Sequence, residues 1–357
     1  MDPFRPRGGG LAFNSKLLFQ CAVALGAGMQ IRDEAKLSAV VAVVTAGFVV
    51  ADLVYAQTSN ISLDPRSYVE FAKVMAMLAA VFLVLVLIER RLTKDQSRIG
   101  RGIAYSAASI RSLAANAALF IPLGFASIYF MYMVAATDKP LMDQSLAVID
   151  GEIGFRWRAF LELANAYPVV AKTLVLAYHS VGPQMPLLFL LLAFADRLRL
   201  TEFMVMLAVS SALTAVGMAL VPAAGAYAYF TPIASDFSNF TARAGVWHLA
   251  ELMKIRSGQP FSLLVTHAEG MVTFPSYHTA LGIMITYALR RLPAIAWPVG
   301  ALNAIMVVST LPEGGHHLID VIAGAAVGAL SISAVWLAQD VYRSVDEASA
   351  QRLREVN

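Results

Sequence analysis

Charged residues are scarce in this sequence. Asp, Glu, Lys and Arg make up 14% of the 357 residues, while 58% are hydrophobic. A soluble domain carries about 25% charged residues, so the deficit indicates a chain surrounded by lipid rather than by water. Cysteine is nearly absent, and the single Cys21 excludes an intramolecular disulfide framework and a zinc site built from cysteines. The net charge of +3 is too small to indicate nucleic acid as a partner.

Long apolar segments take the place of the missing charges. A helix needs about 20 predominantly apolar residues to cross a bilayer. Segments of this kind lie at 37–56, 70–88, 114–136, 169–194, 203–222, 275–290, 293–311 and 318–338. They predict an all-α fold, a polytopic membrane helical bundle of about eight transmembrane helices.

The basic residues gather in alternate connecting segments. Six lie within 89–111, and arginine pairs stand at 197 and 199 and at 290 and 291. Cytoplasmic loops are enriched in Lys and Arg, so these segments and both termini are predicted to be cytoplasmic. The opposite segment 137–168, with five acidic and three basic residues, is then outside. Its apolar residues at mixed helical spacing favour an amphipathic element on the membrane surface.

The first 28 residues allow two interpretations. Arg5, Arg7 and Lys16 precede the apolar segment 17–28, a pattern that resembles a secretory signal peptide. Cleavage would leave Arg32 outside and invert every later loop. We therefore favour an uncleaved interfacial helix. Residues 1–112 are expected to hold the cytoplasmic N-terminus, two additional spans and a basic loop, and 341–357 a cytoplasmic tail.

Polar residues cluster at the start of two predicted spans on the outer side. The first cluster is "EGMVTFPSYHTALGIM", in which Thr273 is a candidate helix cap and Pro275 suits a first helical turn. The second is "PEGGHHLIDVIAG", in which Gly314 and Gly315 permit close backbone approach. Free amide groups at a helix start bind anions. Both helix starts are therefore candidate anion sites.

The spacing of the second cluster pairs a histidine with a carboxylate. Asp320 follows His316 by four residues and His317 by three, so either imidazole can share a helix face with it. A carboxylate fixes the tautomer of an imidazole and stabilises its charged form. With His278 from the first cluster, the set suits phosphoryl transfer, in which one histidine attacks phosphorus and another protonates the leaving oxygen.

A basic segment lies between the fifth and sixth predicted spans. It reads "LMKIRSGQP" and supplies Lys254 and Arg256. An arginine fork matches the oxygens of a phosphate and stabilises charge in the transition state. We expect these two residues to bind the substrate phosphate.

The two clusters resemble the type-2 phosphatidic acid phosphatase superfamily. Its second motif, Pro-Ser-Gly-His, reads 275–278 as Pro-Ser-Tyr-His here. Its third, Ser-Arg-x5-His-x3-Asp, reads Ser309, Thr310, five residues, His316, three residues and Asp320. Because Tyr277 replaces the glycine and the third motif has a doubled histidine, the chain looks like bacterial relatives of inositol phosphorylceramide synthase.

The resemblance implies roles for individual residues. His316 would be the nucleophile that forms a phosphohistidine, Asp320 its orienting partner and His278 the general acid. Ser276 would bind phosphate, and no cofactor or metal would take part. We expect His317, Tyr277 and Gly315 to lie next to these residues and to help position them. The resemblance also implies a six-helix phosphatidic acid phosphatase-type catalytic core within 113–340.

Two departures from the family pattern concern positive charge. Thr310 stands where the superfamily has an arginine, which removes one phosphate ligand. The first motif does not have the form Lys-x6-Arg-Pro, so Arg256 and Lys254 fill that role without a matching pattern. Arg243 is another candidate for the missing charge.

We therefore expect an integral membrane phosphoryl-transfer enzyme, resembling inositolphosphotransferases, that acts on a lipid phosphate or phosphodiester. It is expected in a bacterial inner membrane with its site facing the periplasm. With an alcohol such as inositol as acceptor it is a phosphotransferase, and with water a lipid phosphatase. The alternatives from other classes are a lipid transporter and a non-catalytic scaffold. A transporter predicts internal repeats, which this sequence lacks.

Overall fold

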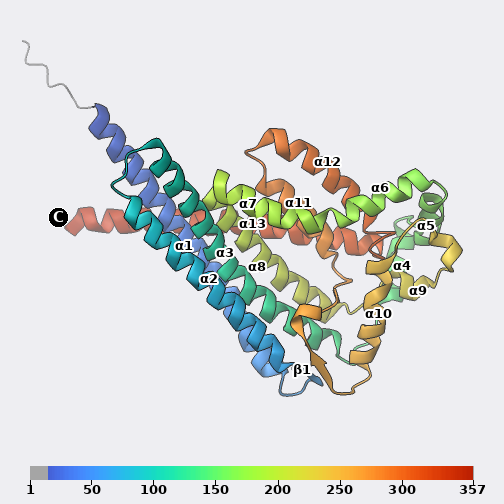
Figure 1. The fold of residues 1–357 in the computed structure, drawn as a ribbon. Helices are drawn as coiled ribbons and strands as arrows, with labels where there is room; N and C mark the ends of the chain where they lie inside the picture. Colours follow the sequence, from blue (N-terminus) through green and yellow to red (C-terminus); the bar gives the residue numbers. More distant parts are fainter. Residues whose placement is uncertain (1–14, 357) are drawn as a thin grey trace, which may run out of the picture.

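Helices make up most of the fold (Figure 1). The computed structural model describes residues 15–356, with side chains from 33 to 340 except at position 244. The helices are α1 (Ser15–Tyr55), α2 (Pro65–Leu92), α3 (Arg98–Ala135), α4 (Asp143–Glu152), α5 (Trp157–Asn165), α6 (Pro168–His179), α7 (Val181–Ala195), α8 (Arg197–Leu220), α9 (Ala226–Phe230), α10 (Arg243–Arg256), α11 (Tyr277–Ala288), α12 (Pro293–Ser309) and α13 (Leu318–Val356). Two short strands, β1 (Ile61–Leu63) and β2 (Phe261–Leu263), and two 3-10 turns complete it. The predicted all-α polytopic fold is confirmed.

Five helices of the described chain are long and apolar enough to cross a membrane. They are α2, α3, α8 and the segments Asp33–Tyr55 of α1 and Leu318–Asp340 of α13. The pair α5 and α6, bent by 110°, makes a sixth if it is counted as one broken span. The chain is therefore an integral membrane protein with five or six candidate spans by length and composition.

Three predicted spans form shorter helices. The segment predicted at 169–194 divides into α6 and α7, which meet at Ser180. In place of the predicted 275–290 and 293–311, α11 has 12 residues and α12 has 17. A 12-residue helix is about 18 Å long, whereas the hydrocarbon core is about 30 Å thick. Hydropathy overestimates the length of such helices because apolar residues of the adjoining loops are counted together with the helical ones.

Helix α8 lies at the centre of the bundle. It contacts α1, α3, α11 and α13, and Phe203, Val205 and Met206 have no exposed surface. Helix α2 is the opposite case, because none of its apolar window is buried inside the protein. Such a large exposed apolar surface is stable when lipid rather than water surrounds the helix. In Figure 1, α1, α2 and α3 run side by side as the longest part of the bundle.

The two strands connect distant parts of the chain. β1 and β2 pair in parallel with Ile61 opposite Phe261 and Leu63 opposite Leu263. The side chain of Asn60 adds hydrogen bonds of 2.9 and 2.8 Å to the carbonyls of Ile255 and Gln259. Strands of three residues carry no readable alternation, so the sequence did not predict them. They join the loop between α1 and α2 to the loop after α10.

The segment 137–168 forms helices that gather with α9 and α10 at one end of the bundle (Figure 1). It contains the helices α4 and α5. At the other end of the chain, the segment 17–28 lies within α1, whose helix begins at Ser15. The fold thus has a long helical body and a cluster of short helices at one end.

Candidate functional site

The two sequence motifs lie against each other because α11 begins on the surface of α13. The backbone amide of Ser276 donates to the carbonyl of Asp320 at 2.9 Å. Gly324, one turn further along α13, makes this approach possible, since a Cβ atom there would lie 2.2 Å from the carbonyl oxygen of Ser276. The two motifs can therefore lie this close only because residue 324 is a glycine and has no side chain.

The carboxylate of Asp320 contacts both histidines of the doubled pair in different ways. Nδ1 of His316 lies 3.4 Å from Oδ2 of Asp320, and both side chains are buried. The backbone amide of His317 donates to the same oxygen at 2.9 Å. His316 is thus the histidine whose ring is paired with Asp320. With Nδ1 on this carboxylate, Nε2 is the ring nitrogen left for chemistry.

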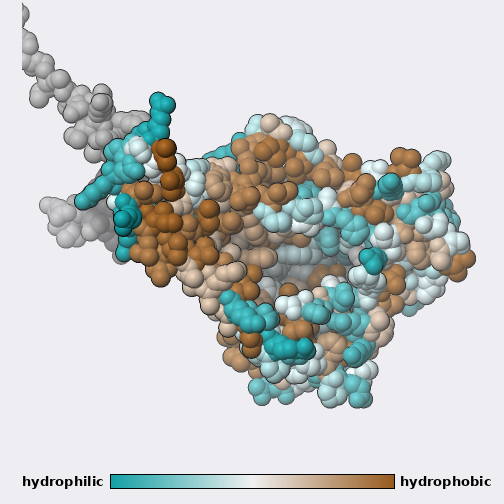
Figure 2. Space-filling model, in the orientation of Figure 1, coloured by the Kyte–Doolittle hydropathy of each residue, from teal (hydrophilic) through white to brown (hydrophobic). Residues whose placement is uncertain are grey.

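His316 and His278 line one cavity of about 460 Å³. Figure 2 shows a hollow near the middle of the face drawn, with polar residues around it and apolar residues beyond. The ring of His278 stacks on Tyr178, with centroids 4.6 Å apart and planes inclined by 23°. The residues that border the cavity are Tyr178, His179, Arg243, Trp247, His248, Glu269, Gly270, Val272, Thr273, Tyr277, His278, Gly314 and His316.

Among the residues described, one Arg or Lys borders this cavity, and it is Arg243. Its guanidinium lies over the ring of Trp247, 4.1 Å from the centroid. Such a cation–π contact holds the planar group in place without neutralising it. Thr310, at the family's arginine position, is fully buried and its hydroxyl donates to the carbonyl of Val307. The cavity's positive charge therefore comes from α10.

The two predicted phosphate ligands Arg256 and Lys254 lie outside the cavity. Arg256 donates to the backbone carbonyls of Ala135, at 3.2 Å, and Lys139. The ammonium of Lys254 lies 5.1 Å from the ring centroid of Phe261. Both side chains fasten the end of α10 to neighbouring segments, because they sit in the last turn of that helix rather than in its first.

Ser276 and Tyr277 are placed differently from each other. Ser276 has no exposed surface and its hydroxyl accepts a bond of 3.1 Å from Thr279, so it does not border the cavity. Tyr277 borders the cavity, while its phenol lies 3.2 and 3.3 Å from the hydroxyls of Ser210 and Ser211 on α8. The residue that replaces the family's glycine thus anchors α11 to the central helix.

The helix start of α13 is not a free anion site, contrary to the sequence-based expectation. The carboxylate of Asp150 on α4 accepts from the amides of Leu318 at 2.8 Å and Ile319 at 2.9 Å. A carboxylate already occupies the position that an anionic ligand would take. At α11, by contrast, no side chain caps the first turn.

His317 lies in a fully buried position between two carboxylates of α4. Nε2 is 3.6 Å from Asp143 and Nδ1 is 3.7 Å from Asp150. Burial opposes its charge, but the ion-pair contacts with Asp143 and Asp150, aided by Asp320, outweigh this effect and raise the pKa of His317 to about 9. His317 is therefore a charged link between α4 and the third motif.

Close backbone packing holds the loop before α13 against α10. Gly315 has φ +70°, and a Cβ atom there would lie 2.9 Å from Cα of Gly245 and 2.8 Å from the ring of Tyr227. The carbonyl of Gly315 also accepts from the amide of Ala226 at 2.8 Å. A side chain at this position would push apart two segments that border the cavity.

Glu313 and His179 form a second carboxylate–imidazole pair that the sequence reasoning missed. Oε1 of Glu313 lies 3.2 Å from Nε2 of His179, which borders the cavity. Asp143 and Asp150 were missed too, although their spacing of seven residues places both on one face of a helix. That spacing was the available signal, whereas no pattern linked His179 to a residue 134 positions away.

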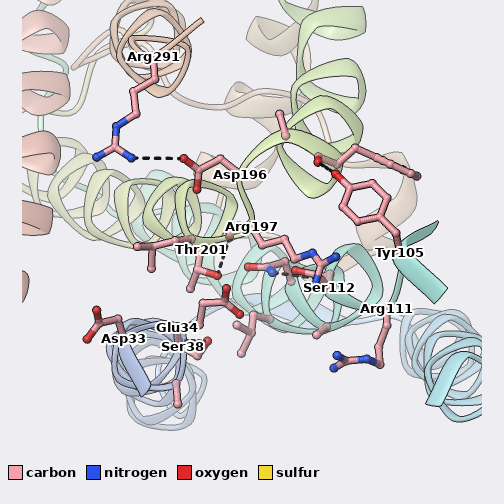
Figure 3. A pocket seen from close by; sticks show the side chains of 17 residues that line it. Asp33, Glu34, Ser38, Tyr105, Arg111, Ser112, Asp196, Arg197, Thr201 and Arg291 are labelled. Carbon is pink, nitrogen blue, oxygen red and sulfur yellow. Dashed lines mark hydrogen bonds and ion pairs between the residues drawn. The ribbon is translucent and has the colours of Figure 1, made fainter. Parts of the chain in front are cut away.

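A second cavity, of about 930 Å³, borders the beginning of α8 (Figure 3). Its arginines already have protein partners. Arg111 pairs with Glu89 at 2.7 Å, Arg291 reaches toward Asp196 at 3.7 Å, and Arg197 lies over the ring of Tyr105. Helix α8 is 24 residues, or about 36 Å, long. The histidine cavity is near its other end, where Thr273 bonds the carbonyl of Ala223.

Comparison with known proteins gives a family and no individual relative. No curated protein and no solved structure matches the chain. A family model described as the PAP2 superfamily matches residues 144–334, which is more than half of the chain and includes both motifs. The chain therefore belongs to the PAP2 superfamily, the type-2 phosphatidic acid phosphatases, whose members are phosphatases and phosphotransferases that act on lipid phosphates.

Proposed function

We propose that the protein transfers a phosphoryl group from a lipid phosphate or phosphodiester to an alcohol such as inositol, through a phosphohistidine at His316. The observation that carries this proposal is the pairing of buried His316 with Asp320 at the edge of a cavity that His278 also borders. Family membership supports the lipid phosphate as substrate class. The acceptor and the intermediate are parts of the proposal.

In the first half of the reaction, Nε2 of His316 attacks phosphorus in line with the bond to the leaving oxygen. The P–N bond forms as the P–O bond breaks, and His278 gives its proton to the departing oxygen. Asp320 holds the tautomer that exposes Nε2 and stabilises the positive charge on the ring. The amide of His317 donates to Asp320 and holds its carboxyl group in position.

Arg243 is proposed to bind the phosphoryl oxygens in place of the family's arginine at Thr310. Its fork is held over Trp247, and it borders the cavity from the first turn of α10. A positioned guanidinium stabilises the charge that builds up on the equatorial oxygens. The free first-turn amides of α11 are a further set of donors for these oxygens.

The site is proposed to face the periplasm of a bacterial inner membrane. Arg197, Arg290 and Arg291 lie at the opposite end of α8, and the positive-inside rule assigns that end to the cytoplasm. Trp247 and Val246, both more than 40% exposed on α10, suit the interface between headgroups and water. A lipid would then present its headgroup to the cavity from the outer leaflet.

Product analysis tests the proposal. Purified protein is incubated with a lipid extract, with and without inositol, and the products are identified by mass spectrometry. With a lipid phosphate as donor, inositol phosphate and the dephosphorylated lipid are expected, and with a phosphodiester donor that loses its headgroup alcohol, a new lipid carrying inositol phosphate is expected. Both products should appear only with inositol. Release of free phosphate in both reactions would instead indicate water as acceptor and a lipid phosphatase. A His316→Ala variant that yields the same products as the natural protein would overturn the proposed intermediate.

A further inference from the structure

His179 is a third imidazole in the candidate active site, and no motif includes it. It is the last residue of α6, it borders the same cavity as His278 and His316, and half of its side chain is exposed. Its Nε2 atom lies 3.2 Å from a carboxylate oxygen of Glu313. The arrangement repeats that of His316 with Asp320, since one ring nitrogen rests on a buried carboxylate.

Glu313 is fixed from several sides. It has no exposed surface, and its carboxylate accepts from the amides of Thr241 at 3.1 Å and Ala242 at 3.3 Å, as well as from the hydroxyl of Thr241. Because the oxygens of Glu313 accept hydrogen bonds, Nε2 of His179, which faces one of them, is the ring nitrogen placed to donate its proton. The lone pair of His179 is then on Nδ1, which has no protein partner among the residues described.

Tyr178 connects this imidazole to the predicted general acid. Its ring stacks on His278 and meets His179 edge-on, with centroids 5.4 Å apart and planes at 87°. The two imidazoles therefore flank one aromatic side chain at the edge of one cavity. In an in-line mechanism the departing and the entering oxygen use the same position, opposite His316. With two imidazoles beside that position, one can protonate the departing oxygen in the first half-reaction and the other can take the proton of the entering oxygen in the second.

We propose that His179, held by Glu313, is the base that activates the acceptor hydroxyl in the second half-reaction; this inference rests on the proposed function. The acceptor oxygen forms a bond to phosphorus while the P–N bond to His316 breaks and its electron pair returns to Nε2. The hydroxyl proton moves to Nδ1 of His179, and Glu313 stabilises the resulting imidazolium. Proton exchange with water in the cavity then restores His179 and His278.

The proposal separates the two half-reactions, and p-nitrophenyl phosphate as donor with inositol as acceptor is a suitable probe. Formation of the phosphoenzyme releases p-nitrophenol in a burst, and its breakdown sets the steady rate. For His179→Gln, we expect a burst within about threefold of the natural protein and a steady rate at least about a hundredfold lower, the usual loss when a general base is removed. Acid-labile phosphate should accumulate on the variant.

Rescue distinguishes loss of the base from loss of structure. Added imidazole should restore part of the steady rate of His179→Gln, because only a folded enzyme that lacks a proton acceptor responds to it. Glu313→Gln should shift the steady rate in the same direction, with the burst retained. His267→Gln, on a residue outside the cavity, is the matched control and should behave as the natural protein.

Each result has a distinct meaning. Breakdown of the phosphoenzyme at the natural rate in His179→Gln would overturn this inference, as would equal loss of burst and steady rate with no response to imidazole. Persistence of the acid-labile phosphate in His316→Ala would overturn the proposed function itself. Failure of this inference is therefore detected with the His179→Gln variant, and failure of the proposed function with the His316→Ala variant.

Discussion

Asp150 and Leu318 are joined by a hydrogen bond of 2.8 Å although 168 residues separate them in the sequence. The same carboxylate accepts from Ile319, so a residue of the surface helix α4 caps the helix that carries Asp320. Together with the contact between His317 and Asp143, this bond makes α4 a structural support of the candidate active site.

Asp150→Ala is expected to destabilise the protein and to lower activity. Loss of a helix cap costs about 1–2 kcal/mol, and the freed amides of Leu318 and Ile319 stay buried behind α4. The apparent unfolding temperature in detergent should fall, and turnover should fall with it. Glu152→Ala, an exposed position on the same helix, is the control. Equal unfolding temperatures for the two variants would argue against the capping role.

The charge of His317 predicts a pH dependence of stability. Its pKa rises from 6.5 to about 9 on folding, so its contribution is complete below about pH 6.5 and is lost as pH rises through 9. A shift of this size corresponds to about 3 kcal/mol. Denaturation measured between pH 6 and 10 should show this loss in the natural protein, and His317→Gln should lack it. A parallel decline in both proteins would contradict the charged assignment.

The general acid is expected to matter most for poor leaving groups. His278→Ala should lower turnover of a lipid phosphate by a factor of about 10² to 10⁴, because the departing alkoxide then leaves without a proton. The loss should be much smaller for p-nitrophenyl phosphate, whose phenolate needs no proton. His316→Ala should be inactive on both substrates. An equal loss for both substrates in His278→Ala would rule out proton donation.

Arg243 and Arg256 provide a matched pair on one helix. Arg243→Ala should lower kcat/KM by a factor of about 10² to 10³, since a transition-state donor is removed. Arg243→Lys should recover only part of it, because the fork is lost. Arg256→Ala breaks the hydrogen bonds to Ala135 at the end of α3 and to Lys139, and should reduce thermal stability with little direct effect on the chemical step. Greater catalytic loss in Arg256→Ala would return the phosphate site to the end of α10.

The close contact of α11 with α13 predicts sensitivity at Gly324. An added methyl group would meet the carbonyl of Ser276 at 2.2 Å, so one helix has to move. We expect Gly324→Ala to cost about 1–3 kcal/mol and to impair catalysis by separating His278 from His316. Gly102→Ala, where a methyl group meets nothing within 4 Å, should be neutral or stabilising. Unchanged turnover in Gly324→Ala would show that the motifs tolerate separation.

Much of the architecture follows from short-range patterns in the sequence. Apolar runs indicated the long helices, and the spacing of four from His316 to Asp320 indicated an imidazole–carboxylate contact, which the structure contains. The sequence left open which of the two histidines uses its ring for that contact. Only the tertiary arrangement decides it, because His317 turns toward α4 instead.

The features that sequence reasoning missed are long-range. Asp150 caps a helix from 168 residues away, and Glu313 joins His179 to the start of α10. No local period encodes such contacts. The charge of Arg256 alone predicts phosphate binding. A basic residue in the last turn of a helix can also donate to nearby backbone carbonyls, and Arg256 does so in the structure. The cavity-facing charge lies at the helix start.

The parallel pairing of β1 with β2 sets an order of events during biosynthesis. Ile61 cannot meet Phe261 until some two hundred further residues have been made, because their pairing is among the longest-range contacts of the chain. The first two helices are therefore made long before the strand that pairs with the loop between them. Synthesis of β2 is thus what finally ties the loop between α1 and α2 to the segment after α10, and a chain truncated before residue 261 would lack this tie.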